Sequence, residues 1–269
     1  MIDKYEIYLD TKYKTSTKRN YLIVVNMFYS YLNLQYKSKV ETVNIGAADV
    51  HNFIKHQQKE KKSVNTLNKY IKVLKNYFNY VWEENLIAVD PIQKLKYFKA
   101  EKPIYDLNVE TLDNIFKSME TIEIELKKKC VFILAMQGFK SSELYIKKDD
   151  VKIEGDVVLI HLHNRVIDIS DIGAKIVKEY LESISNNANP YLFPSPVNPL
   201  RSIDDYRFRS YLKELSVLFN APHLTFERIR QTLILNDYKK GIPIEKIAYH
   251  YGVLSHTVAL FISKFDDEM

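Results

Sequence analysis

The sequence is poor in cysteine, in glycine and in long apolar stretches. Its 269 residues include one cysteine and six glycines, and its apolar runs stay well short of the about 18 residues that a membrane-spanning helix needs. A single cysteine excludes a disulfide within the chain, and Cys130 stands in an apolar segment where a small core residue is expected. We therefore expect no membrane partner and a place in a reducing cytoplasm.

Positive charge is unevenly distributed along the chain. Residues 1–100 contain 17 lysines and arginines against 9 acidic residues, a net charge of +8, whereas the remainder contains 22 against 25, a net charge of −3. A basic segment joined to a nearly neutral one favours a polyanionic ligand such as nucleic acid. The alternative is a solvated, lysine-rich surface, and charge alone does not decide between them. The length of 269 residues favours two domains over one.

Helical spacing of apolar residues dominates residues 1–97. A helix is predicted after the candidate N-cap Ser16, another over residues 47–59, and a longer one from Ser63. The polar face of this last helix carries Asn65, Asn68, Lys69, Lys72, Lys75 and Asn76. We expect a four- or five-helix domain over residues 1–97.

A different pattern follows a charged linker, which we place at residues 98–107. Helices are predicted over residues 109–119, 122–137 and 141–146, and strands over residues 157–163 and 166–169, joined by a tight turn at Asn164 and Arg165. Helical periodicity returns over residues 174–184, 204–219, 226–238, 243–249 and 255–265. Residues 108–269 are therefore expected to form a mainly α-helical domain with a small antiparallel β-sheet.

Three features resemble the tyrosine recombinases, the family of the phage integrases. Gly138-Phe-Lys-Ser-Ser-Glu-Leu144, followed by Asp149 or Asp150, is similar to the family's G-L-R-x-S-E-L box. Leu224-Thr-Phe-Glu-Arg-Ile-Arg-Gln-Thr232 is similar to its L-T-x-H-x-L-R-H-T box, and the predicted helix starts near Thr17 and Ser63 resemble those of its core-binding domain. The resemblance spans nearly the whole chain. It implies a SAM-like helical core-binding domain followed by a domain of the recombinase catalytic type.

The resemblance also implies a chemistry. The family cuts DNA with a tyrosine hydroxyl, which attacks a phosphodiester and becomes linked to the 3′ phosphate. Negative charge gathers in the transition state, so the site needs preorganised cations: two arginines, a lysine and histidines. Carried over position by position, the resemblance places Lys140 at the first arginine, Arg230 at the second, and Glu227, Gln231 and Val253 at the histidines. The lysine of the β-hairpin has no clear equivalent, because only Arg165 stands at the turn.

The attacking tyrosine is not found where the resemblance places it. That window holds Phe261 and Ile262, and no tyrosine follows Tyr251. Because losing the nucleophile abolishes the covalent route, we expect no enzymatic activity, that is, a pseudoenzyme. No cofactor and no metal are expected, since His161 and His163 share a strand face but two ligands do not make a metal site.

We interpret the chain as a sequence-specific DNA-binding regulator, a transcriptional repressor of a prophage or other mobile element that is associated with the nucleoid. Its expected partners are double-stranded DNA and, beyond that, a second copy of the chain or another recombinase. The residues expected to contact DNA are Thr17, Lys18, Arg19, Asn65, Asn68, Lys69, Lys72, Lys75, Lys140, Arg165, Arg228 and Arg230.

Structural alternatives stay open for several of these residues. Arg230 could pair with Glu227 along one helix instead of binding phosphate, and Lys140 could be a solvated surface charge. The polar face of the long helix could be solvated as well.

Two other functions also stay open. An active site-specific recombinase could use Tyr238, Tyr249 or Tyr251 in a rebuilt site, and a covalent protein–DNA adduct would reveal it. An accessory factor could bind another recombinase and modulate its assembly, and co-purification of the two proteins would reveal that.

Overall fold

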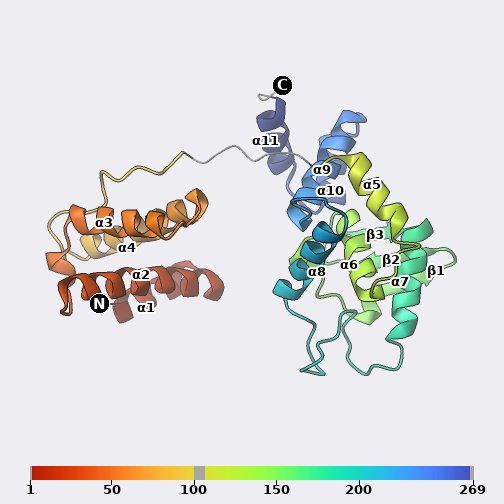
Figure 1. Ribbon diagram of the computed structural model, residues 1–269, viewed down its shortest axis with the longest axis horizontal. Helices are drawn as coiled ribbons and strands as arrows, with labels where there is room; N and C mark the ends of the chain where they lie inside the picture. The colour runs from red at the N-terminus through yellow and green to blue at the C-terminus, as the bar shows by residue number, and fades with distance from the viewer. Residues whose placement is uncertain (1, 100–106, 267–269) are drawn as a thin grey trace. The chain divides into compact units, whose positions relative to one another are not determined.

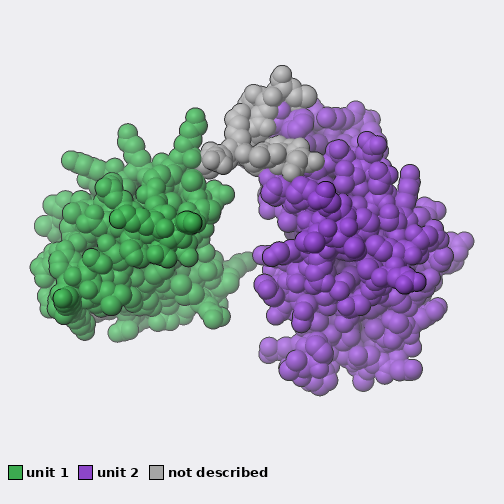
Figure 2. All heavy atoms as spheres, viewed as in Figure 1, with its two compact units in different colours: residues 1–103 green, residues 104–269 purple. Residues whose placement is uncertain are grey.

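The computed structural model describes residues 2–99 and 107–266 of the chain. The chain forms two compact units, residues 1–103 and residues 104–269, which are coloured separately in Figure 2. Residues 100–106, most of the linker predicted at residues 98–107, lie outside the described residues.

The described part of unit 1 forms four α-helices, which Figure 1 shows in red to yellow: α1 (Ile2–Lys12), α2 (Thr15–Tyr36), α3 (Ala47–Lys59) and α4 (Val64–Glu83). A short 3-10 helix, η1 (Thr42–Asn44), connects α2 to α3. The helices enclose an aromatic core in which Phe28 lies edge-on to both Phe53 and Phe78. This arrangement confirms the helical character predicted for the region, and the bounds predicted for α3 agree with the structure.

The predicted helix starts in unit 1 are correct at one position and wrong at another. Ser63 caps α4, where its Oγ accepts a hydrogen bond from the Thr66 backbone at 3.3 Å. Ser16, by contrast, lies inside α2, which begins at Thr15 after Lys14. The physical reason is the short connection from α1: only Tyr13 and Lys14 separate the two helices. The Tyr13 ring packs against Tyr21 and fixes the turn there.

Unit 2 is mainly helical, with one small sheet among its described residues. Its helices are α5 (Val109–Ser118), α6 (Leu126–Met136), α7 (Asp171–Ser183), α8 (Asp205–Leu218), α9 (Phe226–Lys239), α10 (Ile244–His250) and α11 (Ser255–Asp266). The sheet is antiparallel in the order β1 (Val151–Glu154), β2 (Val157–His161) and β3 (Val166–Ile169). Two 3-10 helices, η2 (Ser141–Glu143) and η3 (Lys148–Asp150), lie between α6 and β1. The mainly α class with a small antiparallel sheet is thereby confirmed.

Helix α6 is the centre of unit 2, with α5, α7, α8 and α9 packed around it. Its residues Cys130 to Ala135 are all fully buried, which explains why this segment is apolar on every side. Cys130 is a buried core residue, as predicted.

Three boundaries in unit 2 differ from those predicted. The helix predicted over residues 141–146 is the single 3-10 turn η2, and the long helix begins at Leu126 instead of residue 122. Strand β2 ends at His161, so His163 lies in the following turn. That turn is the predicted one, closed by a hydrogen bond of 2.8 Å from the Leu162 backbone to the Arg165 carbonyl. Strand β1 was not predicted, because its outer position leaves even Ile153 exposed.

A separate apolar cluster holds the last helices together. It comprises Ile234, Ile247, Ala248, Tyr251, Val258 and Ile262, from α9, α10, the turn after it and α11. Within the described ranges, no helix is both long and apolar enough to span a bilayer.

Candidate functional site

The two recombinase-like boxes of the sequence meet at one recess of about 370 Å³ in unit 2. The first box brings Lys140 and Ser141 at the start of η2, and the second brings Thr225, Phe226, Glu227 and Arg230 at the start of α9. Arg209 and Leu212 of α8 complete the lining. Thr225 caps α9, with its Oγ1 accepting from the Arg228 backbone at 3.2 Å. This cap fixes the first turn of α9, which carries Glu227, and Arg230 follows in the next turn.

Arg230 is a half-buried cation that faces this recess. Among the described residues, its guanidinium makes no hydrogen bond or ion pair, and Glu227 is not within salt-bridge distance of it. Glu227 instead accepts a hydrogen bond of 3.4 Å from Gln231, one turn along the helix. Burial lowers the pKa of Arg230, while the charges of Glu143 and Glu227 oppose that shift. The guanidinium therefore keeps its donors for a ligand in the recess.

Lys140 supplies the second cation of the recess and is not simply a solvated surface charge. Its Nζ donates a hydrogen bond of 2.6 Å to the carbonyl oxygen of Gly252, in the turn between α10 and α11. Its backbone nitrogen donates to Glu143 Oε2 at 2.8 Å. Burial lowers the pKa of Lys140, and the nearby charges of Arg230 and Arg165 lower it further.

Arg165, which was expected to contact DNA, is buried. Its side chain has no exposed area, and both terminal nitrogens donate to Glu143, at 2.8 Å to Oε1 and 3.0 Å to Oε2. The guanidinium also lies over the Phe139 ring. The expectation of a DNA contact at Arg165 is therefore wrong for this conformation, because both terminal nitrogens of its guanidinium already donate to the carboxylate of Glu143.

Glu143 is the residue that the sequence analysis missed. Burial would raise the pKa of its carboxyl group, but hydrogen bonds from Arg165 and the Lys140 backbone outweigh burial and lower it. The carboxylate is thus charged and fully engaged. The box around it was recognisable in the sequence, but its partner Arg165 lies 22 residues away and no spacing rule connects the two.

The positions matched to the family's last histidine and to its tyrosine are packed into the C-terminal cluster. Ile262 is buried, and Val253 and Phe261 are partly buried against the same cluster. Tyr251 is also buried, and its hydroxyl donates to Asp237 at 2.7 Å. Tyr249, in contrast, is 64% exposed on α10.

In unit 1 the structure separates the expected DNA contacts into available and occupied side chains. Arg19, Asn65, Lys69 and Lys72 are exposed, with Lys69 at 3.5 Å from Asn20. The partly buried Lys18 pairs with Glu6 and Asp10, and Lys75 lies over the Tyr97 ring. Thr17 is partly buried at the start of α2.

Asn68 is the clearest correction in unit 1. Its amide nitrogen donates to the Phe98 carbonyl at 2.9 Å, and its amide oxygen accepts from the Phe98 backbone nitrogen at 2.8 Å. An amide with both ends engaged by the backbone cannot also read a base edge, so Asn68 fastens the chain after α4. In unit 2, Arg228 similarly donates to Gln231 at 3.2 Å.

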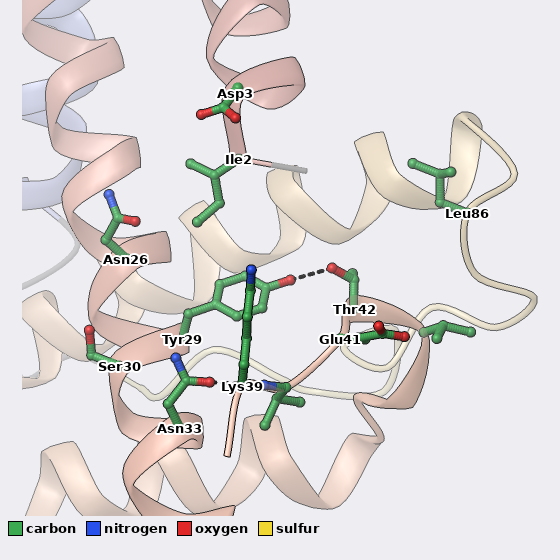
Figure 3. A pocket seen from close by; sticks show the side chains of 12 residues that line it. Ile2, Asp3, Asn26, Tyr29, Ser30, Asn33, Lys39, Glu41, Thr42 and Leu86 are labelled. Carbon is green, nitrogen blue, oxygen red and sulfur yellow. Dashed lines mark hydrogen bonds between the residues drawn. The ribbon is translucent and has the colours of Figure 1, made fainter. Parts of the chain in front are cut away.

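A larger recess of about 690 Å³ lies in unit 1, between the start of α1, one face of α2 and the segment around η1 (Figure 3). At its base the Tyr29 hydroxyl is hydrogen-bonded to Thr42 at 2.6 Å and to Tyr77 at 2.7 Å. Asp3 and Glu41 line it together with a single lysine, Lys39. This balance of charge is unsuited to a polyanion, so the recess at Arg230 is the better candidate for a nucleic acid.

Comparisons with known proteins show similarity to integrases and recombinases. Residues 4–88 match the family described as the phage integrase N-terminal SAM-like domain. A tyrosine recombinase of Thermosipho africanus is 23% identical over 203 residues, which cover 69% of this chain and 70% of that protein. The chain is therefore similar to tyrosine recombinases, and residues 4–88 match the N-terminal domain of the phage integrases.

Solved structures of integrases share the fold along nearly the whole chain. A lambda integrase dimer bound to a COC′ core site matches with a TM-score of 0.69 and 14% identity, over 97% of this chain and 93% of that one. The Tn1549 transposon integrase in complex with a circular intermediate DNA matches with a TM-score of 0.70 and 13% identity, over 96% and 92%.

These relatives correct one expectation. The interpretation of the chain as a non-enzyme is wrong, because the relative from Thermosipho africanus is a tyrosine recombinase and this family is a family of enzymes. The substitutions at Lys140, Glu227, Gln231 and Val253 are differences between this chain and the family's boxes.

Proposed function

We propose that the chain binds a specific duplex DNA site and holds a backbone phosphate of one strand between Arg230 and Lys140. The observation that carries this proposal is the half-buried Arg230 guanidinium, which has no partner among the described residues and faces a recess. Leaving a buried cation uncompensated costs free energy, and an anionic ligand removes that cost. A guanidinium fork also fits phosphate oxygens in a bidentate manner.

Unit 1 supports the same proposal with a different kind of surface. Lys69 and Lys72 of α4 are exposed beside Asn65, and Arg19 is exposed on α2. Exposed lysines of this kind can contact the phosphate backbone, and such contacts supply most of the salt-dependent affinity for DNA. We propose that α4 provides such contacts and that Asn65, rather than Asn68, is available to a base edge.

Binding is tested by fluorescence anisotropy on genomic fragments from around the chain's own gene, across a range of salt concentrations. Arg230→Ala should lower affinity about 10-fold or more and reduce the salt slope by about one. Arg201→Ala removes an exposed arginine outside the recess and serves as the matched control. Equal losses in the two variants, or no preference over random DNA, would contradict the proposal.

Strand cleavage is tested on a nicked suicide duplex, which traps a covalent protein–DNA adduct on a denaturing gel. Tyr249 is the first tyrosine to replace by phenylalanine, because it is exposed three residues before the turn that Lys140 contacts. Tyr238 is next, at 38% exposure. Tyr251 is the control, since its hydroxyl is buried and engaged with Asp237.

We also propose a regulatory consequence of binding, the repression of a phage or mobile-element promoter. A protein that occupies duplex DNA over a promoter excludes the polymerase, whether or not it also cuts strands. A reporter fused to the bound fragment should be repressed by the wild-type chain and released by Arg230→Ala. A reporter unaffected by the wild-type chain would rule out this role and leave DNA binding intact.

A further inference from the structure

The ion pair of the buried Arg165 and the partly buried Glu143 lies beside the recess without lining it. Arg165 is among the few charged residues that are buried in the described part of the chain, and its Nε has no hydrogen-bond partner there. A buried ion pair is a weak source of stability, because desolvation offsets most of the attraction between its charges. A buried nitrogen without a hydrogen-bond partner, such as Arg165 Nε, lowers the stability that the pair contributes still further. Stability alone therefore gives a poor account of this pair.

Glu143 lies near Lys140 and Arg230, the two cations of the recess that we propose bind phosphate. Its Oε1 is 3.9 Å from Lys140 Nζ, and its charge also acts on Arg230. Arg165 takes both carboxylate oxygens at 2.8 and 3.0 Å, so the nearest cation to Glu143 is not one that lines the recess. With the carboxylate engaged in this way, Lys140 Nζ donates to Gly252 at 2.6 Å instead.

The turn that receives Lys140 is fixed by the same arginine. Gly252 has φ +58°, and a Cβ built on it would lie 2.0 Å from Arg165 Nη1, so the backbone rests directly on the guanidinium. On the preceding residue, the Tyr251 ring fills the space beside Gly138, where a Cβ would lie 2.3 Å from its Cδ1. The carbonyl of Gly252 is thus held at one position relative to Lys140.

We propose that Arg165 is a positioning residue, which neutralises Glu143 and thereby keeps Lys140 and Arg230 available to a strand phosphate. This inference rests on the proposed function of the recess. Without Arg165, the carboxylate of Glu143 attracts Lys140 across the present 3.9 Å and competes with the phosphate for it. The role of Arg165 is then exerted through Glu143 and disappears when Glu143 carries no charge.

A double-mutant cycle separates this role from a structural one. Arg165→Met replaces the buried cation by an apolar chain of similar length and should lower DNA affinity about 10-fold, with a smaller salt slope. Adding Glu143→Gln removes the uncompensated carboxylate and should restore affinity to within about threefold of the wild type. A merely structural pair predicts no such rescue, so a folded double variant as weak as Arg165→Met would overturn the proposal.

Thermal unfolding of each variant shows whether it is folded. If Arg165→Met does not fold, the double variant decides alone: near wild-type affinity supports the proposal, and a folded protein with a 10-fold loss overturns it. Arg230→Ala, measured in parallel, keeps the two hypotheses apart. If Arg230→Ala binds DNA normally, the proposed function fails. If it binds weakly while Arg165→Met binds normally, only the positioning role fails.

Discussion

The two units present positive charge in opposite ways. In unit 1 the lysines and arginines outnumber acidic residues by eight over residues 1–100, and those on the polar side of α4, such as Lys69 and Lys72, are exposed. In unit 2 the net charge is negative, yet Lys140, Arg165 and Arg230 are gathered around one carboxylate and are partly or wholly buried. The cations of unit 1 are numerous and many are exposed. The cations around Glu143 in unit 2 are instead held in place by burial and hydrogen bonds.

The largest effect on DNA affinity is expected in unit 1, at the exposed lysines of α4. Reversing two exposed lysines, Lys69→Glu with Lys72→Glu, should lower DNA affinity about 100-fold or more, because two attractive phosphate contacts become repulsive. Anisotropy at fixed salt measures the loss. The control is Lys55→Glu with Lys59→Glu on α3, which changes net charge equally. If the control loses as much affinity, α4 is not the contact surface and only overall charge matters.

The fold of both units was largely predictable, because apolar spacing reports which residues lie on a helix's buried face. Residues 47–59 and the Ser63 cap are correct for this reason. The roles of Asn68 and Arg165 were not predictable. Their partners, Phe98 and Glu143, are 30 and 22 residues away, and a spacing pattern says nothing about which distant segment will lie on a polar face.

A second prediction tests how closely the turn at Gly252 packs against Arg165 in unit 2. Gly252→Ala places a Cβ against the Arg165 guanidinium at positive φ, and it should destabilise the protein by about 3 kcal/mol. Gly241 also has positive φ, +78°, but open space around it. Gly241→Ala should therefore cost only about 1 kcal/mol of backbone strain. Urea unfolding measures both, and equal values would show that the contact with Arg165 is loose.

A third prediction distinguishes structural from DNA-contacting amides on α4. Asn68→Ala removes both hydrogen bonds to Phe98 and should lower the free energy of unfolding by about 1–2 kcal/mol, with little change in DNA affinity. Asn65→Ala, one turn earlier and exposed, should do the reverse. Chemical denaturation and anisotropy on the same samples give the two readings. A large affinity loss in Asn68→Ala at full stability would restore Asn68 as a base-reading residue.

The smallest expected effect is a pH dependence that arises in unit 2 alone. The pKa of Glu143 is lowered in the folded protein, since hydrogen bonds from Arg165 and Lys140 outweigh the opposing effect of burial. A carboxyl group with a lowered folded pKa stabilises the protein above its unfolded pKa, about 4.3, and that contribution is lost as pH falls through the folded value.

Glu143→Gln has no such contribution to lose. The stability difference between wild type and Glu143→Gln should therefore be largest near neutral pH and shrink as the pH falls below about 4. Urea unfolding of both proteins between pH 7 and pH 3 measures it. Glu60→Gln is the control, because Glu60 is exposed on unit 1 and its substitution leaves the buried cation cluster unchanged. A stability difference that stays constant down to pH 3 would mean that the charge of Glu143 does not stabilise Arg165. The contrast between the exposed cations of unit 1 and the cations held around Glu143 in unit 2 would then lose its main support.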